Sequence, residues 1–174
     1  MKKLLIILSL ISFNVFGAGT ESSSNSSSAS SNVSVDGSGS NNNSSTTPPD
    51  QINTLYELAE KHIYNKKYDK SLKLLKKLTK REDLGTRRAD IYNLLGFSYR
   101  KLDNPELDKS FAAYMMALDL DPVHAGAHEY LGELYLMRDQ KDEALKMLSK
   151  LEGLVGKNAE EYKDLLKAIE NYQS

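Results

Sequence analysis

One spacing of large, small and aromatic residues occurs three times between residues 58 and 151 of this chain. A large residue precedes a small one, and three positions later comes an aromatic residue or histidine: Leu58-Ala59-His62, Leu95-Gly96-Tyr99 and Leu131-Gly132-Tyr135. A second set with helical spacing follows each: Ser71, Leu75, Leu78; Ser110, Tyr114, Ala117; Ala144, Leu148, Leu151. The small residue returns after 37 and then 36 positions. A period of this length is typical of stacked helix pairs.

This pattern resembles the tetratricopeptide repeat, whose units are usually about 34 residues long. In that family, helix A carries the large-small pair and helix B carries a second small residue, because the two helices cross closely there. The segment from Glu129 to Tyr172 also resembles small exported bacterial members of the family. The resemblance implies an all-α, tetratricopeptide-like helical solenoid of about three helix pairs with a C-terminal capping helix. It also implies a role in binding other proteins.

Local signals predict where the helices begin and end. The first two are predicted over residues 51–64 and 68–80, and the third runs from after Thr86 to residue 101. Asn104 is the predicted N-cap of the fourth, which ends before Asp121-Pro122. The sixth is predicted over 141–152, with Gly153 and Gly156 breaking it. Asn158 and Glu161 form a pair similar to a capping box before the last helix. That helix places four residues on one face, as docking requires: Tyr162, Leu165, Leu166 and Ile169.

The N-terminal third predicts export followed by a spacer. Residues 1–18 combine Lys2 and Lys3 with a short apolar run and small residues, which is the pattern of a secretory signal peptide. An uncleaved anchor is the alternative, although the run is shorter than the about 20 residues of a spanning helix. Residues 19–49 are rich in Ser, Asn and Gly and predict a disordered tether, or a glycosylated stalk through its Asn-x-Ser sites. Residues 50–174 are the predicted repeat domain.

Composition narrows the function classes. Without Lys2 and Lys3 the chain has 21 Lys and Arg against 24 Asp and Glu, a formal charge near −3. This balance argues against a nucleic-acid binder and against strong adhesion to anionic lipid. The chain has no cysteine, which excludes disulfides, thiol chemistry and lipoprotein attachment. No later segment is apolar enough to span a membrane, so no stable insertion is expected after signal cleavage.

The sequence offers little for catalysis. No nucleophile, base and orienting group stand at recognisable spacing, and no phosphate-binding glycine loop is present, so we expect no enzyme and no cofactor. His124 and His128 are four residues apart and would share a helix face, with Asp121 or Glu129 nearby. A metal-handling periplasmic protein that uses His124 and His128 is therefore an alternative function. Packing roles are the stronger interpretation of both histidines, and no metal site is predicted.

The family resemblance also implies a binding groove lined by helix A. The positions carried over are Asn53, Tyr56, Glu60, Ile63 and Tyr64; Asn93, Phe97, Arg100 and Lys101; Glu129, Glu133, Leu136 and Met137. This mixed surface of aromatic residues and methionine suits a peptide or a helix. Its acidic residues argue against the Lys/Asn/Arg clamp with which one subgroup grips C-terminal carboxylates. The predicted partner-binding residues are Tyr56, Tyr64, Asn93, Phe97, Arg100, Glu129, Glu133 and Met137.

These observations predict a non-enzymatic adaptor or scaffold. It would bind another protein or peptide on its concave face, either as a helix in a groove or as an extended segment. The signal pattern places this activity in the bacterial envelope, in the periplasm or outside the cell. A self-assembling structural protein is a further alternative, against which the charged face of the last helix argues.

Overall fold

The computed structural model describes residues 49–173. The predicted signal peptide and all but the last residue of the predicted tether lie outside the described residues. Within residues 49–173 the chain forms seven α-helices and no strand. Among these helices, none is both long enough and apolar enough to cross a membrane. The described residues form one compact unit.

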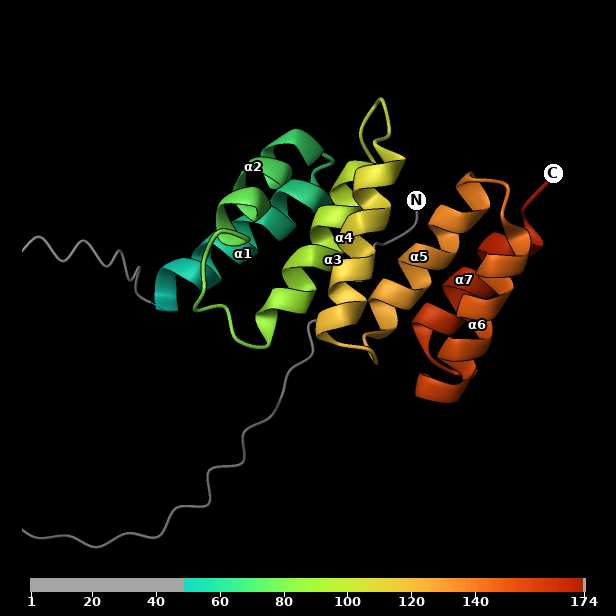
Figure 1. The fold of residues 1–174 in the computed structure, drawn as a ribbon. Helices are drawn as coiled ribbons and strands as arrows, with labels where there is room; N and C mark the ends of the chain where they lie inside the picture. Colours follow the sequence, from blue (N-terminus) through green and yellow to red (C-terminus); the bar gives the residue numbers. More distant parts are fainter. Residues whose placement is uncertain (1–48, 174) are drawn as a thin grey trace, which may run out of the picture. The chain divides into compact units, whose positions relative to one another are not determined.

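The helices follow one another as packed pairs (Figure 1). The first pair is α1 (Pro49–Tyr64) and α2 (Tyr68–Leu78), and the second is α3 (Arg87–Arg100) and α4 (Leu107–Leu120). The third pair is α5 (Ala125–Met137) and α6 (Lys141–Val155), and α7 (Glu160–Glu170) packs against both of its helices. The architecture confirms the predicted all-α solenoid of three pairs with a capping helix.

Contacts between successive pairs show which side of the stack is the inner one. Each odd-numbered helix touches the next odd-numbered helix, from α1 to α3 to α5 to α7. Within residues 49–173, the backbones of α2 and α4 stay farther apart, as do those of α4 and α6, with no Cα–Cα distance of 8 Å or less. Because the odd-numbered helices converge and the even-numbered ones spread apart, the stack curves around α1, α3, α5 and α7. We call the surface that these four helices share the inner face.

The small residues of the repeat lie at the helix crossings. Ala59, Ser71, Ser110 and Ala144 are fully buried, with relative exposures of 0%. A Cβ on Gly96 would lie 2.6 Å from Cε1 of Tyr114, and the Ser110 hydroxyl donates to the Gly96 carbonyl at 2.8 Å. These contacts confirm that close crossing, rather than helix propensity, explains the glycine in α3.

Several predicted helix ends are wrong. The fourth helix begins at Leu107 rather than after Asn104, since the Glu106 amide donates to the Tyr99 carbonyl at 3.1 Å and holds the preceding loop against α3. The sixth helix continues through Gly153 and ends at Val155. Its C-cap is Gly156, whose φ of +78° is unfavourable for other residues. Ala159 is the N-cap of α7, without a side-chain hydrogen bond, so the Asn158 capping box is also wrong.

Candidate protein-binding face

The repeat period aligns the predicted contact residues in rows across the inner face. Steps of 37 and 36 residues relate the positions in α1, α3 and α5. The four rows, each given from α1 to α5, are Tyr56, Asn93, Glu129; Glu60, Phe97, Glu133; Ile63, Arg100, Leu136; and Tyr64, Lys101, Met137. Each row therefore contains one residue from each helix pair, and these residues occupy equivalent positions in α1, α3 and α5.

The eight predicted contact residues differ strongly in exposure. Tyr64 and Met137 are the most accessible, with relative exposures of 65% and 46%. Tyr56 and Glu133 are half-buried. The other four are buried: Asn93, Phe97, Arg100 and Glu129. Direct contact with a partner in this conformation therefore falls on the row at the C-terminal ends of the helices, where Lys101 is exposed as well.

Arg100 is the centre of the buried part of the inner face. Its side chain is 2% exposed, and its guanidinium forms an ion pair with Glu133 of α5 through Nη1. Its Nε donates to the Tyr114 hydroxyl of α4 at 3.3 Å. Burial lowers the pKa of Arg100, but Tyr114 and Glu133 outweigh this effect and raise it overall, so the residue stays charged. Arg100 thus links α3 to α4 through the hydrogen bond and to α5 through the ion pair.

Aromatic rings enclose this guanidinium. It lies 5.6 Å from the ring centre of Phe97 and 5.5 Å from that of Tyr130. The Phe97 and Tyr130 rings are 5.0 Å apart, and Tyr68 of α2 meets Phe97 edge-on at 6.3 Å. Cation–π contacts of this kind strengthen when water is excluded. This cluster, which consists of Arg100, Phe97, Tyr130 and Tyr68, therefore forms a closely packed layer beneath the middle of the inner face.

Among the acidic residues of the inner face, Glu129 has the most strongly shifted pKa. Burial raises its pKa to about 9, with further increases from Glu133, Asp164 and Glu161, while Arg100 acts in the opposite direction. Glu129 is consequently protonated and uncharged at neutral pH. The repulsion of a partner carboxylate was predicted from the acidic residues of helix A, namely Glu60, Glu129 and Glu133. An uncharged Glu129 adds nothing to it, and Glu133 is paired with Arg100.

Two polar atoms of the cluster have no hydrogen-bond partner within the described residues. They are Oδ1 of Asn93 and Nη2 of Arg100, and both are buried. Asn93 and Arg100 are seven residues apart in α3, so they lie on the same helix face. An unsatisfied buried polar group costs about 1–3 kcal/mol. The inner face thus holds one unused acceptor and one unused donor.

The two candidate metal ligands have other roles. His124 is the N-cap of α5: its Nδ1 accepts from the Ala127 amide at 3.1 Å, and its Nε2 lies 3.1 Å from Asp90 Oδ1. Since Nδ1 accepts, Nε2 carries the ring proton and donates a hydrogen bond to Asp90. His128 Nε2 lies 3.0 Å from the Pro122 carbonyl and donates to it. In the part of the chain that the structure describes, no group of three metal-ligating side chains converges.

Solved structures similar to this chain are helical repeat proteins. The Yersinia enterocolitica type III secretion translocator chaperone SycD aligns with a TM-score of 0.58 at 20% identity, over 71% of this chain and 89% of SycD. Two MamA structures give TM-scores of 0.56 and 0.53 at 24% and 20% identity, over 70% and 71% of this chain and 64% and 77% of theirs. The fold is tetratricopeptide-like. No protein-family model and no curated protein matches the chain.

Sequence reasoning did not assign Tyr68 and Tyr130 to the binding face. Their contact with Phe97 depends on how α2, α3 and α5 pack, which the repeat period does not specify. Helical periodicity gives no signal for Tyr130, because it is one position after Glu129 and neighbouring residues on a helix do not share a face.

Proposed function

We propose that this protein is a non-enzymatic adaptor or scaffold of the bacterial envelope that binds another protein on its inner face. The observation that carries the proposal is the exposed row Tyr64, Lys101 and Met137, one residue from each pair. Aromatic and methionine side chains are enriched where protein surfaces bind partners. The repeat places them along one face, as a bound helix or extended segment requires.

The cluster below this row supports the same function. Arg100, Phe97 and Tyr130 fix the spacing of α3 and α5, so the exposed row stands on a preorganised base, which lowers the cost of binding. The likeness to SycD, a secretion translocator chaperone, agrees with a protein partner. The envelope location follows from the signal pattern of residues 1–18 and is part of the proposal.

Capture of a partner by variants of the full chain tests this proposal. We expect the tagged protein to enrich one partner from native envelope extract, and Tyr64→Ala with Met137→Ala to reduce its recovery about tenfold. Both side chains are exposed, so the variant keeps its helical circular dichroism.

The matched control is Met115→Ala with Met116→Ala on α4, where both residues are about as exposed as Met137, at 45% and 42%. The control removes a similar amount of apolar side chain away from the inner face, so it is expected to capture the partner normally. Equal loss in both variants, or full recovery in the Tyr64/Met137 variant, would contradict binding at the inner face.

A further inference from the structure

The segment that contains α2 carries far more positive charge than the rest of the chain. Residues 61–81 contain nine Lys or Arg and one Asp, a net charge of +8, whereas the whole chain has a net charge of −1. Within this segment, Lys70, Lys73 and Lys77 recur at steps of three and four residues along one side of α2. Lys66 and Lys80 lie in the turns just before and just after this helix. All five are exposed. We call these five lysines the lysine stripe.

The lysines of the stripe are not neutralised by any residue that the structure describes. Within residues 49–173 none of them forms an ion pair, whereas four lysines elsewhere do: Lys109, Lys146, Lys157 and Lys163. The opposite side of α2 is occupied by the core, in which Leu72, Leu75 and Leu78 are buried. The stripe therefore presents uncompensated positive charges along a helix whose opposite face is packed against the core.

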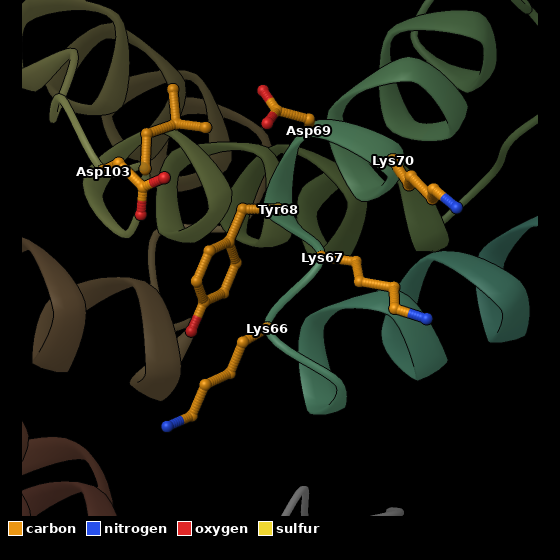
Figure 2. A pocket seen from close by; sticks show the side chains of 7 residues that line it. Lys66, Lys67, Tyr68, Asp69, Lys70 and Asp103 are labelled. Atoms are coloured by element: carbon orange, nitrogen blue, oxygen red, sulfur yellow. The ribbon is translucent and has the colours of Figure 1, made fainter.

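A pocket lies at the N-terminal end of the stripe (Figure 2). Its volume is about 210 Å³, and its lining includes Lys66, Lys70 and the ring of Tyr68. Figure 2 shows the Lys66 side chain and the Tyr68 hydroxyl extending the same way, away from the carboxylates of Asp69 and Asp103. The pocket is thus large enough for one acidic side chain, with an ammonium group at its edge.

We propose that the lysine stripe is a second docking surface, separate from the inner face, for an acidic segment of a protein. Charge complementarity is the physical basis: a row of like charges with no internal counter-charge attracts a partner of opposite sign and orients it along the helix. The stripe goes beyond the proposed adaptor function because its lysines lie outside the four rows of the inner face.

The structure favours an acidic protein segment over other anionic surfaces. Binding to a bilayer is strengthened by apolar side chains that enter it, and Leu72, Leu75 and Leu78 of α2 are buried in the core while Leu74 is partly buried against it. Single-stranded nucleic acid binds through bases stacked on aromatic rings, and Tyr68 is already packed against Phe97. An acidic segment needs only the charges that the stripe supplies.

Fluorescence polarisation of a labelled decaglutamate peptide with the full chain tests the proposal. We expect saturable binding that weakens as NaCl rises from about 50 mM to about 500 mM, because salt screens exposed charges. Lys70→Glu, Lys73→Glu and Lys77→Glu together are expected to weaken binding at least about tenfold. The neutral variant with glutamine at the same three positions is expected to weaken it less, and it guards against a folding defect.

The matched control reverses three exposed lysines elsewhere: Lys141→Glu, Lys150→Glu and Lys167→Glu. It changes the net charge equally and is expected to keep binding within about twofold. Absence of saturable binding, or equal loss in the control, would overturn the proposal. Tighter binding to vesicles with anionic lipid or to a DNA duplex, lost in the same variant, would overturn the assignment to a protein partner.

Discussion

Gly132 lies where α5 approaches α7 too closely for a larger side chain. A Cβ at this position would meet Leu165 Cδ2 at 2.6 Å and Cδ1 at 2.7 Å. Replacing glycine by alanine in a helix normally gains about 1 kcal/mol, but overpacking a core costs about 1–3 kcal/mol. We therefore expect Gly132→Ala to lower the free energy of unfolding, measured by urea denaturation.

The matched control for this prediction is Gly153→Ala in α6. No atom lies within 4 Å of a Cβ at Gly153, so alanine is expected to stabilise the protein by up to about 1 kcal/mol. If Gly132→Ala raised stability as much as Gly153→Ala, the close approach of α5 and α7 would not constrain the repeat.

Glu129 makes stability depend on pH. Its folded pKa is about 9, raised by burial first and then by Glu133, Asp164 and Glu161, whereas an unfolded glutamate titrates near 4.3. Between these values the folded state binds more protons than the unfolded state, so stability falls as pH rises through this window. Glu129→Gln removes this dependence, and we expect it to stabilise the protein at pH 8 by about 2 kcal/mol or more.

Chemical denaturation at pH 5 and at pH 8 checks this prediction. The variant is expected to differ little from the wild type at pH 5, where Glu129 is protonated in the folded state, and to exceed it clearly at pH 8. A constant difference between the two proteins at both pH values would show that Glu129 does not titrate in this window.

Phe97 and Arg100 support the inner face from below rather than offering it for contact. Both are buried, and Arg100 is paired with Glu133. Phe97→Ala with Arg100→Glu removes a core ring and places two carboxylates together, so we expect a loss of at least about 3 kcal/mol of stability. Urea denaturation measures it, and a wild-type midpoint would contradict the buried cluster.

At the scale of the helix, α7 completes the third pair. It buries Tyr162, Leu165 and Ile169 against α5 and α6. Burying a large apolar side chain stabilises by about 1.5–3 kcal/mol. A chain that ends at Gly156 leaves the surfaces of α5 and α6 uncovered.

We expect this truncated chain to unfold at a lower urea concentration and to bind the dye ANS, which fluoresces on exposed apolar surface. An unchanged midpoint without dye binding would show that α7 is not a stabilising cap.

The sequence predicted helix identity and phase better than helix ends. The repeat period placed Ala59, Gly96 and Gly132 at crossings because packing of small residues is a local requirement of each pair. The predicted end of α6 was wrong because a glycine such as Gly153 costs only about 1 kcal/mol inside a helix. Of Gly153 and Gly156, only Gly156 adopts a positive φ, and the helix ends before it. The family resemblance supplied the residues assigned to the inner face. It did not predict their burial, because the rings around Arg100 come from neighbouring helices.

At the scale of the folded unit, the two proposals divide partner binding between two surfaces. The odd-numbered helices supply a shaped inner face with exposed Tyr64 and Met137, and α2 supplies a row of uncompensated lysines. A shaped surface favours tight and selective binding, while a charged one favours rapid encounter. An adaptor that uses both would recognise a partner with a groove-binding segment and an acidic one.

Site-specific photo-crosslinking tests the central claim, binding at the inner face, most directly. A photoreactive amino acid is placed in the full chain at Tyr64, at Met137 or, as the control, at Met115 of α4, and each protein is irradiated in native extract. We predict the same partner adduct from Tyr64 and Met137 and none from Met115. An adduct from Met115 alone, or equal adducts from all three positions, would contradict the inner face as the binding surface.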